Sequence, residues 1–194
     1  TSEQLKAFSV QGAPESVLAR YGDDSFGRGC YVATQLIKSG VRCVEVTLGG
    51  WDTHVNNTAA QQNRIRLLDP AMAAMVADLK ADDLLKDTVV IWAGEFGRTP
   101  QLNAAGGRDH WPHGFSVVVG GGGIRGGQIV GETNLMPDVR AENNSSRVVN
   151  PVSIADVHAT VLKALSIDYT QELETPIGRP MAISEGTPIA QLIG

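Results

Sequence analysis

The sequence predicts an α/β protein with a mostly parallel β-sheet flanked by helices. Short apolar runs at 41–48, 87–93 and 115–119 alternate with longer segments whose apolar residues recur at helical spacing. The run at 87–93, DTVVIWA, is apolar without alternation, as expected for a parallel strand that is covered on both faces. Strands that alternate with helices in this way are typical of folds built around a parallel sheet.

The N-terminal part is expected to supply two helices. Residues 1–25 are polar and irregular, with one short helix expected at 15–21. A longer helix is expected at 26–39, because its apolar residues share one face and Gly40 occupies the position just beyond its end. The first strand follows at 41–48.

A long helical segment is expected between the first two strands. Residues 58–85 are predicted to form two helices, since Pro70 fits the first turn of the second one and Asp69 fits its N-cap. Further strands are expected at 115–119 and 128–130, on either side of a glycine-rich turn.

Residues 132–149 are polar and loop-like, and a last helix is expected after them. It is predicted to begin at Pro151, with Asn150 as its N-cap, and to end near Ser166. His158 lies on this helix and is expected to be packed or partly exposed, not a ligand.

Composition and charge narrow the class of protein. The 194 residues suffice for one domain with a sizeable core. A formal net charge of -5 without a Lys/Arg cluster argues against nucleic acid as a partner. No apolar run approaches the roughly 18 residues that a membrane span requires. The two cysteines, Cys30 and Cys43, are expected to be small buried core residues.

Residues 44–57, VEVTLGGWDTHVNN, carry the first group of reactive side chains. If the backbone stays extended beyond the two glycines, Asp52 and His54 lie on one side and Trp51 and Thr53 on the other. Open α/β sheets keep their chemistry just beyond strand ends of this kind. The alternative is a polar loop in which Asp52 caps the next helix and His54 is solvated.

Other acids and histidines lie next to the later strands. Glu95 and Arg98 follow the second strand, whereas Asp109, His110 and His113 precede the third. Loops at one edge of a parallel sheet converge, and a set of His nitrogens and carboxylates suits zinc, manganese or similar divalent ions. One or two ions are possible. The alternative is three separate loops of satisfied polar side chains.

Three motifs resemble a known family: GGWDTH, TVVIWAGEFGRTP and GRDHWPHGFSVVVGGGGIRGGQIVGET. They are similar to the bacterial secreted family called domain of unknown function 1501, which belongs to the alkaline phosphatase and sulfatase superfamily. The resemblance covers residues 21–192. It implies an alkaline phosphatase-like fold and a periplasmic or secreted location, although this chain carries no signal peptide.

The resemblance also implies a set of metal ligands. By position, Asp52, His54, Glu95 and His113 resemble metal ligands of the superfamily, with Glu95-Phe96 standing where the superfamily has Asp-His. Asp109 and His110 are then expected as replacement ligands or as partners of the ligands. Arg98 is expected to pair bidentately with an anionic substrate, the alternative being a plain surface ion pair. The predicted site therefore comprises Asp52, His54, Glu95, Arg98, Asp109, His110 and His113.

One part of the superfamily's machinery has no counterpart in this chain. The nucleophile of the superfamily lies in its N-terminal half, after the first strand, and nothing before Phe26 resembles that strand and turn. We therefore expect residues 1–194 to form a single α/β domain that is the C-terminal portion of a longer protein, with an irregular segment at 1–25.

The sequence thus predicts a metal-dependent, hydrolase-like domain for phosphate or sulfate esters that is incomplete without an upstream half. Its cofactor is expected to be zinc or manganese, as one or two ions. Its substrate is expected to be a small anionic ester or a glycan-linked ester. The alternative is a non-catalytic secreted module that keeps the fold for binding or as a scaffold. The oligomeric state is left open.

Overall fold

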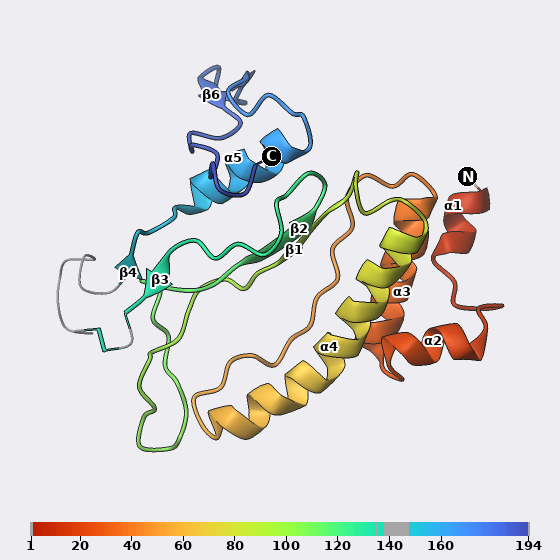
Figure 1. Cartoon of the computed structure of the whole chain (residues 1–194), viewed down its shortest axis with the longest axis horizontal. Helices are drawn as coiled ribbons and strands as arrows, with labels where there is room; N and C mark the ends of the chain where they lie inside the picture. The colour runs from red at the N-terminus through yellow and green to blue at the C-terminus, as the bar shows by residue number, and fades with distance from the viewer. Residues whose placement is uncertain (1, 135, 138–147, 194) are drawn as a thin grey trace. The chain divides into compact units, whose positions relative to one another are not determined.

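A computed structural model describes residues 2–134, 136–137 and 148–193. It combines helices with small antiparallel sheets, so the composition is α/β overall (Figure 1). The chain divides into two compact units, which are described separately below. The first unit comprises Thr1–Leu84 and Leu102–Asp109, and the second comprises Leu85–Gln101 and His110–Gly194.

The first unit is helical. Its helices are α1 (Ser2–Ala7), α2 (Glu15–Tyr21), α3 (Ser25–Lys38) and α4 (Asn57–Ala81). Helices α2 and α3 lie where the sequence predicts them. The carboxylate of Asp24 begins α3, because its Oδ1 accepts hydrogen bonds from the N–H groups of Phe26 and Gly27 at 2.8 and 3.0 Å. Gly40 follows the helix end with φ +87°, which favours glycine.

Helix α4 is continuous through Pro70, so the prediction of two helices is wrong. A proline inside a helix costs about 3 kcal/mol, because it lacks the N–H group and crowds the preceding turn. The residues around it explain why the helix continues. Leu68, Ala71 and Ala74 are all buried, at 6%, 0% and 4% exposure. Their burial against α3 outweighs the local cost.

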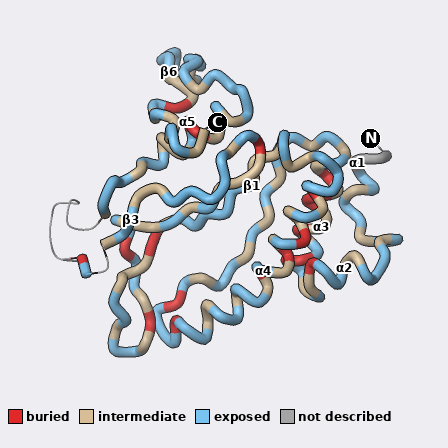
Figure 2. Tube along the Cα trace, in the orientation of Figure 1, coloured by how far each residue is buried: buried red, intermediate tan, exposed pale blue. Residues whose placement is uncertain are grey.

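The core of the first unit lies between α2, α3 and α4. Helices α3 and α4 pack side by side (Figure 1), and several of the buried stretches that Figure 2 colours red lie along them. The phenol of Tyr21 is fully buried, and its hydroxyl contacts Asp78 Oδ2 at 2.9 Å and Thr34 Oγ1 at 3.2 Å. Burial raises the pKa of this phenol. The core cluster contains Tyr21, Phe26, Cys30, Leu68, Ala71 and Ala74.

The predicted first strand, residues 41–48, is not part of a sheet in the described chain. It is an elongated segment (Figure 1) in which Val46 and Leu48 pack against the helical core and Glu45 and Thr47 are exposed. The alternation typical of a strand is therefore present without a hydrogen-bonded neighbour. Cys43 lies on this segment and is exposed, so the prediction that it is buried is wrong, whereas Cys30 is buried as predicted.

The second unit contains three two-stranded sheets, and all three are antiparallel. Strand β1 (Val89–Trp92) pairs with β2 (Val118–Gly121), β3 (Glu132–Thr133) with β4 (Val148–Val149), and β5 (Glu172–Glu174) with β6 (Pro180–Ala182). The second and third predicted strands are thus present, although the third is shifted toward the glycines. The prediction of a strand at 128–130 is wrong.

No large parallel sheet is present among the described residues, so this part of the fold prediction is not confirmed. Contacts within the segment that connects β1 to β2 explain the antiparallel pairing. Trp111 N–H donates to the carbonyl of Gly97 at 2.9 Å, and Arg98 and His110 form an antiparallel bridge. These contacts lay the two strands side by side in opposite directions, with Val89 opposite Gly121 and Trp92 opposite Val118.

Helix α5 (Ile154–Ala164) begins later than predicted. Its N-cap is Ser153 and not Asn150. The Ser153 Oγ accepts from the Asp156 N–H at 3.0 Å, and the Asp156 carboxylate accepts from the Ser153 N–H at 3.1 Å. This reciprocal capping box satisfies two backbone donors, which a start at Pro151 does not. His158 is exposed on this helix.

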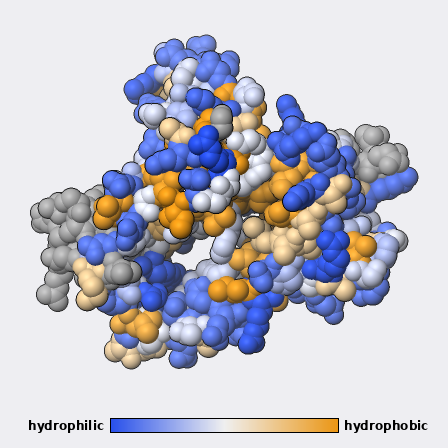
Figure 3. Space-filling view, viewed as in Figure 1, coloured by the Kyte–Doolittle hydropathy of each residue, from blue (hydrophilic) through white to orange (hydrophobic). Residues whose placement is uncertain are grey.

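The surface of the second unit is mixed, because polar side chains lie beside exposed apolar ones such as Ile129, Leu173 and Ile177. Strands β5 and β6 are exposed over most of their length, and Figure 3 shows hydrophilic side chains around β6. Part of the predicted polar loop at 132–149 lies outside the described residues. Among the helices that the structure describes, none has the length and apolar character needed to cross a membrane.

Candidate metal site

Asp52 and His54 lie on one side of the backbone, as the period of two predicts. Gly50 makes the turn before them with φ +90°, a conformation that favours glycine. On the other side, Trp51 packs against the helical core and Thr53 is buried at 5% exposure. The Thr53 hydroxyl accepts hydrogen bonds from Asn57 Nδ2 at 2.6 Å and from Gln61 Nε2 at 3.3 Å. Thr53 therefore anchors this loop to the start of α4.

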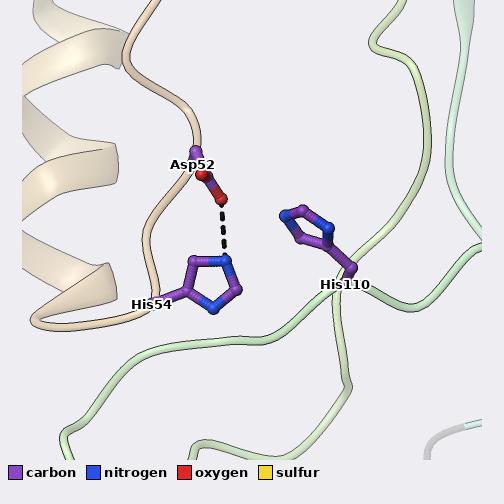
Figure 4. A group of neighbouring side chains, drawn as sticks. All are labelled: Asp52, His54 and His110. Atoms are coloured by element: carbon purple, nitrogen blue, oxygen red, sulfur yellow. Dashed lines mark ion pairs between the residues drawn. The ribbon is translucent and has the colours of Figure 1, made fainter.

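The imidazole of His54 lies between two carboxylates. Its Nε2 is 3.0 Å from Asp52 Oδ1, and its Nδ1 is 2.7 Å from Asp109 Oδ1. The side chains of Asp52, His54 and Asp109 are 66%, 46% and 53% exposed, so solvent can reach all three. Figure 4 marks the contact between Asp52 and His54 with a dashed line; His110, also drawn there, belongs to the second unit.

A neutral imidazole has a single N–H group, so it can donate to only one of these carboxylates. The shorter contact, 2.7 Å to Asp109, favours the tautomer with the proton on Nδ1. Nε2 then holds a lone pair beside the Asp52 oxygen, and this arrangement of two electron donors suits a cation. The Oδ1–Nε2 distance of 3.0 Å also fits two ligand atoms that each lie about 2.0–2.2 Å from one divalent ion.

A short loop at 102–109 brings Asp109 to His54. Its backbone is bonded to the residues around His54: Asn57 N–H donates to the Gly106 carbonyl, and Arg108 N–H donates to the Thr53 carbonyl, both at 2.9 Å. An isolated antiparallel bridge between Val55 and Gly106 adds to this contact. Two segments that are about 50 positions apart are therefore held together by main-chain hydrogen bonds.

The alternative in which Asp52 caps the next helix is wrong. The N-cap of α4 is Asn56, which adopts the left-handed conformation at φ 48°. Asp52 instead faces His54, and His54 is held by two side chains and is not merely solvated.

The other predicted site residues lie in the second unit. Glu95 is exposed three positions after β1, and Arg98 forms the bridge with His110. The ring of His110 also lies 4.5 Å from that of Phe96, centroid to centroid. His113 is exposed and contacts Trp111 edge to face at 5.6 Å. That these four residues join Asp52 and His54 at one site stays a prediction.

One contributor to the cluster was not predicted from the sequence. Asn103 donates from Nδ2 to the His54 carbonyl at 3.0 Å and to Asp109 Oδ1 at 3.2 Å. An asparagine followed within four residues by two glycines indicates a turn. That signal predicts the local backbone but not the long-range contact with His54.

Helices, small sheets and a histidine held between two carboxylates define an α/β protein with a candidate metal site. The chain belongs to the family described as Protein of unknown function (DUF1501), which matches residues 1–193. This match confirms the family resemblance seen in the three sequence motifs. No curated protein matches the chain. No solved structure matches it either.

Proposed function

We propose that Asp52 and His54 bind a divalent metal ion, zinc or manganese, and that the domain contributes this site to a hydrolase of phosphate or sulfate esters. One observation carries the metal site: His54 Nδ1 is 2.7 Å from Asp109 while His54 Nε2 is 3.0 Å from an oxygen of Asp52. A ligating histidine in proteins commonly gives its other ring N–H to a carboxylate in this way.

Each residue of the cluster has a separate role in this proposal. Asp52 Oδ1 and His54 Nε2 are the ligand atoms. Asp109 accepts a hydrogen bond from the Nδ1–H group. This bond orients the ring and increases the basicity of Nε2. When bound, a divalent ion supplies a Lewis acid that polarises an ester oxygen and stabilises the charge of the transition state.

Two ligand atoms do not complete the coordination of a metal ion, so further ligands are required. His110 is the first candidate, because it directly follows Asp109 and consecutive Cα atoms lie about 3.8 Å apart. Glu95 and His113 follow from the resemblance to the alkaline phosphatase superfamily, as does Arg98 as a bidentate contact for the anionic group. The superfamily fold, the secreted location and the upstream nucleophile belong to the same proposal.

A second candidate function is a metal-binding scaffold without catalysis. The hydroxyl groups near the predicted site support it. The Thr53 hydroxyl is buried and accepts two hydrogen bonds from α4, and the Thr99 hydroxyl donates to the carbonyl of Gln101 at 2.9 Å. Both hydroxyls therefore have structural hydrogen-bond partners.

Thermal unfolding with added zinc or manganese tests the metal site. An ion at a hundredfold excess over its Kd stabilises the native state by about 2.7 kcal/mol. For a chain of this length that is a rise in Tm of roughly 5–10 °C. His54→Ala is expected to abolish most of this rise. His158→Ala is the matched control, because His158 is exposed on α5, and it should leave the rise intact.

Equal shifts in wild type and His54→Ala would refute the site. Catalysis is then tested with aryl phosphates and aryl sulfates in the presence of the ion that binds. Turnover that His54→Ala abolishes supports the hydrolase. Metal binding without turnover, in a protein that includes any upstream half, supports the scaffold.

A further inference from the structure

We infer that Asn103 is a positioning residue of the metal site, which fixes the orientation of Asp109 and thereby the tautomer of His54. This inference rests on the proposed metal binding. Asn103 does not touch the proposed ligand atoms. It acts through Asp109, whose carboxylate it holds against the His54 ring.

The amide nitrogen of Asn103 bridges the two residues that it positions. Nδ2 is 3.0 Å from the His54 carbonyl oxygen, 3.2 Å from Asp109 Oδ1 and 3.4 Å from Asp109 Oδ2. One amide group therefore ties the backbone of His54 to the carboxylate of Asp109. The shared acceptor Oδ1 is the same atom that contacts His54 Nδ1 at 2.7 Å.

The amide oxygen of Asn103 is fully engaged on the opposite side. Oδ1 accepts from the N–H groups of Ala105 at 3.0 Å and Gly107 at 2.9 Å. The Asn103 N–H also donates to the Gly107 carbonyl at 2.9 Å. The oxygen thus faces only donors and the nitrogen only acceptors, so the side chain has one orientation that satisfies both ends.

The tautomer follows from this orientation. Both carboxylates can only accept hydrogen bonds, and a neutral ring has one N–H group to donate; the shorter contact, 2.7 Å to the Asp109 Oδ1 that Asn103 also contacts, favours the proton on Nδ1. Nε2 is then left with its lone pair toward Asp52. Without the Asn103 amide, the Asp109 carboxylate loses the hydrogen bonds that it accepts from Nδ2. The His54 ring can then present either nitrogen to the Asp52 carboxylate.

Asn103→Asp separates this role from turn formation. An aspartate keeps an oxygen where Oδ1 accepts from Ala105 and Gly107, so the turn can be retained. It removes both N–H donors and places a second carboxylate about 3 Å from that of Asp109. Asn103→Ser, which carries no charge, is a second variant in case Asn103→Asp fails to fold.

The matched control is Asn134→Asp. Asn134 also accepts from a backbone N–H two residues ahead, that of Met136 at 3.0 Å, and it lies in the second unit. Substitution there makes the same chemical change and the same change in net charge. It should leave His54 and the zinc affinity unchanged.

Two measurements test the inference. Long-range ¹H–¹⁵N spectra of the His54 ring, without metal and at about pH 8.5 where an ordinary imidazole is neutral, report the tautomer directly. Wild type is expected to carry the proton on Nδ1, and both Asn103 variants are expected to shift toward a mixture. Calorimetric titration with zinc should show affinity reduced by about 10- to 100-fold in these variants.

The outcomes separate this inference from the proposed function. A wild type that has the Nδ1 proton but does not bind zinc would refute the metal site and leave the positioning role in place. A folded Asn103→Asp or Asn103→Ser variant with the wild-type tautomer and wild-type zinc affinity would overturn the positioning role.

Discussion

At the scale of the residue, the cluster depends on a close approach of two backbones at Gly107. Gly107 is buried, and a Cβ atom there would lie 1.8 Å from the His54 carbonyl oxygen. This is the same carbonyl that accepts from Asn103. Any side chain at position 107 must therefore separate the loop at 102–109 from the segment that carries His54.

Gly107→Ala is expected to destabilise the chain by about 1–3 kcal/mol, because the added methyl group cannot fit without a backbone shift. The Nδ1–Asp109 contact should be lost with it. Gly49→Ala is the control, since a Cβ at Gly49 meets nothing within 4 Å. Chemical unfolding of both variants measures the difference. If Gly107→Ala were as stable as Gly49→Ala and kept the wild-type ring tautomer, the close approach would be refuted.

The sequence predicted the residues of the cluster better than their partners. Alternation along an extended chain was enough to place Asp52 and His54 on one side, and their 3.0 Å contact follows from it. Asp109 was predicted as a replacement ligand or as a partner of the ligands, and in the structure it contacts Nδ1 of His54. Asn103 was missed, because its contacts across 49 positions depend on main-chain bonds that no local pattern encodes.

At the scale of the element, the segment 41–48 has the pattern of a strand without the hydrogen bonds of one. Val44, Val46 and Leu48 are half-buried, and Glu45 and Thr47 are exposed between them. In the described chain no strand pairs with this segment. Side-chain packing therefore holds the segment against the helical core, together with a hydrogen bond from Trp51 Nε1 to the Leu48 carbonyl at 2.7 Å.

Hydrogen exchange is expected to distinguish this segment from the helices beneath it. The amides of residues 42–50 should exchange rapidly, because no ladder protects them. The amides of 30–37 in α3 should be protected, since that helix is buried against α4. Exchange measured on peptides from both regions checks this. Protection of 42–50 equal to that of α3 would show that the segment is paired after all.

The helices were more predictable than the sheets. The limits of α2 and α3 follow from local signals, namely caps, spacing and Gly40. Strand direction is not a local property. The apolar run VVIW predicts a covered strand but does not identify its neighbour, and β1 pairs antiparallel with β2. The predicted helix boundary at Pro70 is wrong, because the burial of apolar side chains on both sides of the proline outweighs the local cost of placing a proline inside a helix.

At the scale of the whole molecule, the family match spans both units, from residue 1 to residue 193. The first unit contributes Asp52, His54, Asn103 and Asp109, and the second contains the remaining predicted site residues. The chain passes between the units at positions 109 and 110, within the motif GRDHWPH. The family match therefore covers both units, whereas the cluster around His54 lies within the first.

The stability of the molecule in acid is expected to depend on two aspartates of the second unit. The backbone N–H of Thr187, at 2.7 Å, and then the Ser153 side chain and N–H hold the pKa of Asp156 below its ordinary value. The hydroxyl and N–H of Thr170 do the same for Asp168. Hydrogen bonds of this kind favour the ionised carboxylate.

The sign of the pH dependence follows from the lowered pKa values. Near and below the ordinary aspartate pKa of 3.8, the unfolded chain binds more protons than the folded one at these sites. Their contribution to stability is therefore complete above that pH and is lost as the pH falls through the lower folded-state pKa values.

Asp156→Asn removes one of these two ionised carboxylates. Its unfolding free energy should lie below that of wild type at about pH 6, and the gap should narrow toward about pH 2 as wild-type Asp156 is protonated. A gap for Asp156→Asn that is constant with pH would contradict the role assigned to Asp156.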